Sequence, residues 1–229
     1  FHCFGCSAGG DVFKFVMLHE QMDFMGAVRL LAERAGIRLE YEAGGEASQV
    51  PEKEKLYKLH TAVAALFHRG LLESPAAEAA RAYLRQRALP DELANDFLIG
   101  YAPDQWDMLV QWTAKKGYAP DLVALAGLVI KSEKPDSGIR YYDRFRNRLI
   151  FPIRDEQGRV IAFSARALST DDQTAKYINS PETPLFRKGA VLYALDRARH
   201  AIVDHREAIL CEGQIDVIRC HQMGFTRAL

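Results

Sequence analysis

Two carboxylates near the C-terminal end of the sequence stand where metal-assisted chemistry could occur. The segment 208–218 reads AILCEGQIDVI, so an apolar run reaches Glu212, Gly213 makes a turn, and Asp216 falls on the first turn of a predicted helix. Such strand-to-helix junctions often hold metal ions or phosphates in α/β sheets. A charge at the end of a buried strand is costly unless it is paired or bound, which favours magnesium binding or proton transfer in phosphoryl chemistry. The alternative is that these carboxylates only cap the helix.

Two cysteines at the other end have the spacing of half a zinc site. Cys3 and Cys6 enclose a phenylalanine and a glycine, and this tight turn lets two thiolates bind one zinc ion. A redox pair and chance spacing remain open. Structural zinc needs four ligands, and the neighbouring His2 would point to the opposite face of a strand. We therefore expect the other two ligands upstream of Phe1, and we interpret both chain ends as truncations.

The composition is that of an ordinary globular protein. The chain has 229 residues, a hydrophobic fraction of 48% and a formal net charge of zero, which leaves room for more than one domain. No apolar run approaches the length of a membrane span, and we expect no contact with a membrane. Free thiols beside a zinc pair fit a reducing compartment, and Cys211 reads as a small buried apolar residue. Only residues 131–190 are clearly basic, with 12 Lys and Arg against 8 Asp and Glu.

The basic block contains a stretch in which arginines alternate with aromatic residues. If residues 140–148 form a strand, Arg144, Arg146 and Arg148 share one face of it. Guanidinium groups flanked by aromatic rings suit a polyanion whose bases can stack. The alternative is an edge strand that its charges protect from aggregation.

A second polar segment follows, with the sequence KYINSPET over 176–183 and a further basic pair before Gly189. Loops between ordered elements often hold binding residues. Lys176, Tyr177 and Asn179 are the candidates here, since the tyrosine could stack on a base or bind a phosphate. Lys188 is a point charge of the kind that suits phosphate. The alternative is an ordinary solvated loop.

Helical and strand patterns must position these residues. Residues 1–42 predict two short helices, the first capped by Asp11 and the second, after Asp23, ended by Gly36. Residues 43–51 resemble a flexible linker, and 52–130 are mostly helical. Beyond that region, the spacing predicts strands over 147–153 and 159–165 joined by a hairpin turn, a helix over 193–203, a strand over 207–212 and a helix over 214–223.

Taken together, six segments resemble the DnaG-type bacterial replicative DNA primases, in order along nearly the whole chain. The segments are FHCFGC with the following GGD, ERAGI at 33–37, RAYLRQR at 81–87, YDRFRNRLIFPI at 142–153, KYINSPET at 176–183 and EGQIDV at 212–217. The resemblance implies a DNA-dependent RNA polymerase that makes short RNA primers from NTPs on a single-stranded DNA template. It also implies zinc and magnesium as cofactors.

The resemblance assigns roles to individual residues. Cys3 and Cys6 match the last two ligands of the family's zinc site. Positions that the family uses to hold template or nucleotide correspond to Arg87, Arg166, Tyr177 and Lys188. Glu212 matches the glutamate of a Toprim domain, which serves catalysis and binds magnesium, and Asp216 follows one helical turn later. The family's D-x-D metal ligands would lie beyond Leu229.

The implied architecture is an α+β or α/β multidomain protein. We expect the C-terminal half of a zinc ribbon with two helices over 1–42, a linker over 43–51, a helical and mixed-sheet primase core over 52–206, and the first strand and helix of a Toprim domain over 207–229. The family acts in the bacterial cytoplasm at the replication fork and binds the replicative helicase through a domain absent here. The alternatives are a nucleic-acid-binding fragment without catalysis, and a plasmid or phage primase-helicase.

Overall fold

The computed structural model divides the chain into two compact units, Phe1–Gln49 and Val50–Leu229. The structure describes residues 1–6, 8–20, 24–37, 39, 52–134, 138–168 and 175–229. The predicted linker over 43–51 and the helix-preceding Asp23 lie outside these residues. No helix in the described ranges combines the length and the apolar character that crossing a bilayer requires.

The first unit contains the two predicted helices, α1 (Val12–His19) and α2 (Phe24–Arg34). Asp11 caps α1 as expected, because its Oδ1 accepts a hydrogen bond of 2.8 Å from the Lys14 backbone N–H. Gly36 ends the second helix with a left-handed φ of 65°. Few side chains of this unit are buried, so its two helices supply only a small apolar core.

The second unit carries the remaining elements. Its helices are α3 (Glu52–Glu73), α4 (Glu78–Gln86), α5 (Asp91–Asp96), α6 (Met108–Lys115), α7 (Pro120–Leu125), α8 (Leu195–His205) and α9 (Gln214–Gln222), with short 3-10 turns at Pro75–Ala77 and Lys188–Ala190. Its strands are β1 (Gly100–Ala102), β2 (Val129–Lys134), β3 (Gly138–Asp143), β4 (Arg148–Arg154), β5 (Val160–Ala167) and β6 (Tyr177–Asn179). The fold is thus the mixed α/β class that the sequence predicts.

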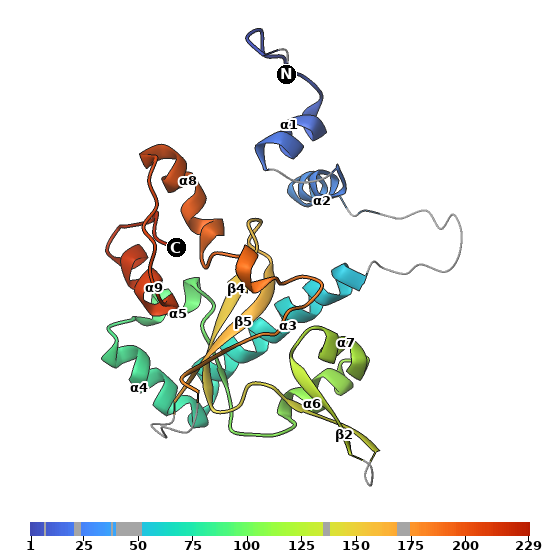
Figure 1. Ribbon diagram of the computed structural model, residues 1–229, viewed down its shortest axis with the longest axis vertical. Helices are drawn as coiled ribbons and strands as arrows, with labels where there is room; N and C mark the ends of the chain where they lie inside the picture. Colours follow the sequence, from blue (N-terminus) through green and yellow to red (C-terminus); the bar gives the residue numbers. More distant parts are fainter. Residues whose placement is uncertain (7, 21–23, 38, 40–51, 135–137, 169–174) are drawn as a thin grey trace, which may run out of the picture. The chain divides into compact units, whose positions relative to one another are not determined.

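Four strands form the central sheet, in the order β1-β4-β5-β6, and each neighbouring pair is antiparallel. The predicted hairpin is present: β4 and β5 are joined by a turn in which Gly158 has a φ of 80°. Strands β4 and β5 are buried almost throughout, so both faces of the sheet are covered. Helix α3 runs along one of these faces (Figure 1).

Side chains alternate along the strands, so the two faces of the sheet border two different hydrophobic cores. Ile150, Phe163 and Ala165 face the core that α3 and the α6–α7 pair complete. Leu149 and Phe151 face the second core, which contains apolar residues of α4, α5 and α9. Because side chains alternate across a strand, Ser164 and Arg166 of β5 point to this second face.

Helix α9 is hydrogen-bonded to the residue that follows α4 and packs against the same core. The Arg219 guanidinium donates a hydrogen bond of 2.7 Å to the carbonyl of Ala88, directly after α4. Val217 and Ile218 of α9 are buried in the second core beside Leu84 of α4. The two helices therefore bring the C-terminal carboxylate segment and the C-terminal end of α4 to the same side of the sheet.

The predicted strand over 207–212 is wrong within the described residues. Ile209 forms a single parallel bridge with Ala228, supported by a hydrogen bond of 3.0 Å from the Cys211 N–H to the carbonyl of Leu229. One bridge does not extend into a ladder, because a β-strand needs successive paired residues. The helix that follows is present over Gln214–Gln222 and ends before Gly224, whose φ is 86°.

Candidate functional site

Two arginines and two tyrosines meet at one edge of the central sheet, and we call this group the Arg–Tyr cluster: Tyr83, Arg87, Arg166 and Tyr177. The first two stand on consecutive turns at the end of α4. The other two lie opposite each other on β5 and β6, as Cα partners in the antiparallel register. Residues 79 to 94 positions apart in the sequence are thus assembled by the packing of α4 on the sheet.

Tyr83 touches both arginines. The Arg166 guanidinium carbon lies 3.8 Å from the centre of the Tyr83 ring. The Arg87 Nε–H donates a hydrogen bond of 2.9 Å to the Tyr83 hydroxyl, and its guanidinium carbon lies 5.3 Å from the same ring. A cation above an aromatic ring contributes about 0.5–2 kcal/mol, depending on its exposure. One aromatic side chain therefore contacts two positive groups.

The charges of these two arginines are not neutralised by carboxylates within the described part of the chain. Helix α4 offers a direct comparison, because Glu78 pairs with Arg81 at 3.0 Å and with Arg85 at 2.6 Å. The Arg85 and Arg81 guanidinium groups lower the pKa of Glu78. By contrast, Arg87 forms its hydrogen bond with a tyrosine, and Arg166 donates to the carbonyl of Ala167 at 3.0 Å. The cluster thus keeps a positive charge that an anionic ligand could neutralise.

Polar groups continue along the same face of β5 and β6. Ser164 and Asn179 are Cα partners two residues along the register from Arg166 and Tyr177, so all four side chains share one face. Among the described residues, Ser164 Oγ, Asn179 Oδ1 and Arg166 Nε are buried with no hydrogen-bond partner. Buried polar atoms nearly always have a partner, which can be a ligand or an ordered water. This strip can therefore bind a polar ligand.

The carboxylate of Asp216 lies close enough to act on the cluster. Burial raises the pKa of Tyr177, the nearby Arg166 guanidinium opposes this shift, and the charges of Tyr83 and Asp216 add to it. Tyr177 still exposes 38% of its surface. The structure thus brings three predicted site residues together, Arg87, Arg166 and Tyr177, and places Asp216 within electrostatic range of Tyr177.

The two carboxylates of the C-terminal segment are both exposed, which corrects one premise of the sequence interpretation. Glu212 does not end a buried strand, so the energetic cost of burying its charge does not arise. Asp216 occupies the first turn of α9, and its Oδ2 lies 3.2 Å from the position that a Cβ on Gly213 would take. Among the residues that the structure describes, neither carboxylate forms an ion pair, so both are accessible to a cation.

The structure separates the three arginines that were predicted to share one strand face. Strand β3 ends at Asp143 and β4 begins at Arg148, so Arg144 and Arg146 lie in the connection between them. Arg146 stacks on Trp106 with its guanidinium carbon 4.0 Å from the ring centre, and burial lowers the pKa of Arg144. The predicted row of guanidinium groups is therefore not formed.

The buried Arg148 also rules out the alternative of a protected edge. This residue is only 8% exposed and donates to the carbonyl of Ala175 at 2.9 Å. Strand β4 lies between β1 and β5, so Arg148 belongs to a central strand. Its guanidinium ties β4 to the segment before β6, which is a structural role.

The two predicted lysines stand apart from the cluster. Lys176 and Lys188 are both exposed, and in the described residues no hydrogen bond or ion pair links either ammonium group to the cluster. The backbone N–H of Lys188 donates to Glu182 Oε1 at 2.9 Å, which fixes the start of the 3-10 turn. Exposed ammonium groups such as these can reach a ligand only by extending toward it.

The two N-terminal cysteines form a tight turn that suits a metal. The Cys3 N–H donates to the carbonyl of Ala8 at 2.7 Å, and His2 forms a β-bridge with Gly9. Backbone N–H groups of Cys6 and Gly5 directed at the Cys3 sulfur lower its pKa, which favours the thiolate that binds zinc. In the described residues no group of three or more potential ligands forms, so this unit offers zinc two sulfur ligands.

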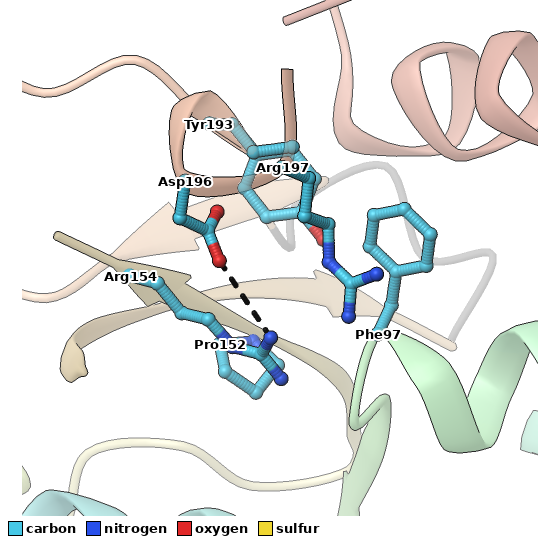
Figure 2. A pocket seen from close by; sticks show the side chains of 7 residues that line it. Phe97, Pro152, Arg154, Tyr193, Asp196 and Arg197 are labelled. Carbon is cyan, nitrogen blue, oxygen red and sulfur yellow. Dashed lines mark ion pairs between the residues drawn. The ribbon is translucent and has the colours of Figure 1, made fainter. Parts of the chain in front are cut away.

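A separate shallow hollow lies between α5, β4 and α8. Figure 2 shows Arg154 facing Asp196, 3.7 Å apart, and the Arg197 guanidinium beside the ring of Phe97. Arg197 also donates to Asp96 at 2.7 Å. Burial raises the pKa of Asp196. Each arginine here is matched by a carboxylate, so this hollow is a charge-balanced junction, unlike the Arg–Tyr cluster.

Two polar residues of the site were not predicted from the sequence. The sequence predicts a helical region around Tyr83 and a strand that includes Ser164, but no role for either side chain. The spacing of four between Tyr83 and Arg87 was a usable signal, since residues i and i+4 are neighbours on a helix. Ser164 gave no such signal, because its importance depends on its partner across the sheet.

Comparison with known families and proteins gives consistent matches. Residues 1–47 match the CHC2 zinc finger, and residues 67–199 match the N-terminal domain of the DNA primase catalytic core. A DNA primase from Deinococcus radiodurans is 44% identical over 229 residues, which are the whole of this chain and 38% of the relative. The chain thus spans well under half of that protein's length.

Two solved structures have the same fold. The Aquifex aeolicus primase, with its zinc-binding and RNA polymerase domains, aligns with a TM-score of 0.69 at 32% identity, over all of this chain and 53% of its own. A DnaG primase catalytic domain bound to single-stranded DNA aligns with a TM-score of 0.64 at 37% identity, over 77% of this chain and 53% of its own.

Proposed function

The chain belongs to the DnaG-type bacterial DNA primases, and on that premise we propose that it serves template-directed synthesis of short RNA primers on single-stranded DNA. The observation that carries this proposal is the Arg–Tyr cluster, where Arg87 and Arg166 converge without a carboxylate partner among the described residues. Such paired guanidinium groups suit the phosphates of a nucleotide or a template strand.

The cluster would bind and orient phosphates in this reaction. Arg87 and Arg166 each present N–H donors to phosphate oxygens, and Tyr177 beside them can stack on a base or donate its hydroxyl proton in a hydrogen bond. Burial raises the pKa of Tyr177, so that hydroxyl stays protonated at neutral pH. Weaker contacts along the DNA template would come from the exposed Lys176 and Lys188 and from Arg144, Arg146 and Asn179.

The exposed carboxylates of Glu212 and Asp216 would hold magnesium at the other side of the cluster. Two carboxylates suffice as protein ligands, because magnesium commonly completes its shell with water and substrate phosphates. Bound magnesium would supply charge neutralisation on the phosphates of the incoming nucleotide. Both carboxylates are exposed and form no ion pair among the described residues, and Asp216 lies within electrostatic range of Tyr177.

The remaining parts of the proposal concern domains and partners. We assign residues 1–42 to the C-terminal half of the zinc ribbon, 52–206 to the primase core and 207–229 to the start of a Toprim domain. Zinc held by Cys3 and Cys6 would stabilise the first unit, whose apolar core is small. The partners would be single-stranded DNA, NTPs, the RNA primer and, through residues beyond this chain, the replicative helicase in the bacterial cytoplasm.

The proposal is tested in two steps. The chain itself is titrated with a labelled single strand by fluorescence anisotropy, and binding that weakens steeply with added salt is expected. Primer synthesis is then assayed with a chimera in which the Deinococcus radiodurans relative supplies the residues after Leu229. Magnesium-dependent RNA products support the proposal, and their loss on Glu212→Gln supports the role of that carboxylate. Binding without synthesis by an otherwise folded chimera would support a nucleic-acid-binding module instead.

A further inference from the structure

We propose that Tyr83 is a positioning residue that fixes Arg87 and Arg166 as one anion-binding unit. The inference rests on the proposed function, because it concerns how the same site holds a phosphate. Tyr83 is the one residue in the described structure that contacts both of these arginines. Its proposed role is to hold the two guanidinium groups at a fixed spacing before the ligand arrives.

Each part of Tyr83 holds a different arginine. The hydroxyl accepts the hydrogen bond of 2.9 Å from Arg87 Nε–H. The ring face lies 3.8 Å from the guanidinium carbon of Arg166. Stacking on a ring and donation from Nε both leave the terminal N–H groups of an arginine directed outward, where phosphate oxygens can accept from them. The tyrosine thus contacts both guanidinium groups without using their terminal N–H donors, of which one on Arg166 donates to the carbonyl of Ala167 at 3.0 Å.

The two arginines come from elements that could not fix this spacing alone. Arg87 is the C-cap residue of α4, and Ala88 after it has a left-handed φ of 52°, so the helix ends at this point. Arg166 lies near the end of β5. Long arginine side chains with like charges repel and lose much rotational freedom when they converge. A shared aromatic partner offsets this repulsion, because its negative ring face attracts one cation and its hydroxyl oxygen attracts the other.

Preorganisation is the functional consequence. A ligand that meets two arginines already oriented does not bear the entropic cost of ordering them. Tyr83 is half-buried and also packs against the second core, so a purely structural role is the competing explanation. The two roles make different predictions, because a structural role changes stability whereas a positioning role changes affinity through Arg87 and Arg166.

Two substitutions separate the hydroxyl from the ring. Tyr83→Phe keeps the ring and the packing but removes the acceptor for Arg87. Tyr83→Leu keeps apolar packing but removes both interactions. We expect affinity for a labelled single strand to fall about 2- to 10-fold for Tyr83→Phe and about 10- to 100-fold for Tyr83→Leu. The salt dependence of binding should stay as in the wild type, because no charge is lost.

A matched control is available elsewhere in the chain. Tyr57 stacks with Arg159, whose guanidinium carbon lies 4.1 Å from the ring centre, and Arg159 is neutralised by Asp155 at 2.8 Å. Tyr57→Leu therefore removes a similar stack of arginine on tyrosine whose cation is already paired. This variant should bind single-stranded DNA as the wild type does, even if its melting temperature falls.

A double-mutant cycle measures whether Tyr83 and Arg87 are coupled in binding affinity, and a purely structural role of Tyr83 predicts no such coupling. In an Arg87→Gln background, Tyr83→Phe should cause no further loss of affinity, since the hydroxyl has no arginine left to orient. Additive losses, or affinities of Tyr83→Phe and Tyr83→Leu equal to that of Tyr57→Leu, would overturn the inference while leaving the proposed function intact. Failure of the wild-type chain to bind single-stranded DNA would instead overturn the proposed function, and this inference with it. Melting curves of each variant confirm that the comparisons are made between folded proteins.

Discussion

The contrast between Arg85 and Arg87 allows a direct test of which arginines of α4 bind a nucleic acid. Both residues are exposed at the end of the same helix, and replacement of either by glutamine removes one positive charge. Arg85 is paired with Glu78 at 2.6 Å, whereas Arg87 contacts only the Tyr83 hydroxyl and ring among the described residues. A carboxylate that already neutralises a guanidinium reduces its attraction for phosphate.

The expected size of the effect follows from counterion release. Each phosphate contact on a single strand contributes about 0.7 to the slope of log affinity against log salt. We expect Arg87→Gln to reduce that slope by about 0.7, and a double Arg87→Gln, Arg166→Gln variant by about 1.4. Between about 50 and 200 mM salt, the wild-type chain should lose about 2.6-fold more affinity than Arg87→Gln does.

The assay is fluorescence anisotropy of a labelled single strand at several sodium chloride concentrations, with Arg85→Gln as the matched control. Arg85→Gln should leave the slope close to that of the wild type, because its partner Glu78 then turns to Arg81 alone. Equal slopes for Arg85→Gln and Arg87→Gln would refute the reasoning. That result would mean that net charge, and not the Arg–Tyr cluster, determines binding.

Three further predictions concern stability and metal binding. His60 is fully buried and desolvation lowers its pKa from 6.5, so the unfolded chain takes up the proton more readily. The contribution of His60 to stability should thus be complete above pH 6.5, and the free energy of unfolding should fall on acidification by up to about 1.4 kcal/mol per pH unit. Urea titrations at several pH values should show that this dependence is weaker in His60→Phe. Asp143 accepts from the N–H groups of Leu109 at 2.7 Å and Val110 at 3.0 Å at the start of α6. Asp143→Ala should therefore cost about 2–3 kcal/mol in the same titration, and a loss below 0.5 kcal/mol would contradict this tie. Chelation of zinc should alter the unfolding of Phe1–Gln49 and leave that of Val50–Leu229 unchanged in calorimetry, since the two cysteines with zinc spacing both lie in the first unit.

Several local features could be predicted from the sequence because short-range chemistry determines them. The cap at Asp11, the left-handed Gly36 and the β4–β5 hairpin depend on residues within a few positions of each other. The apolar stripe of α3 likewise follows from helical periodicity, since Leu56, Leu59 and Val63 are fully buried. Residue types and spacing supplied most of the candidate site residues, and the resemblance to a family added Arg87 and Arg166.

The site itself depends on tertiary packing. Arg166 meets Tyr83 because α4 packs on the second face of the sheet, and no pattern within either segment specifies that distance. The same limit explains the wrong prediction for residues 144–148, where alternation suggested one exposed face. Arg148 is instead buried in a central strand, because strand order, which the sequence does not encode locally, placed neighbours on both sides of β4. Sequence periodicity reports which residues share a face of one element, whereas the ligand that a site can bind depends on which elements pack together.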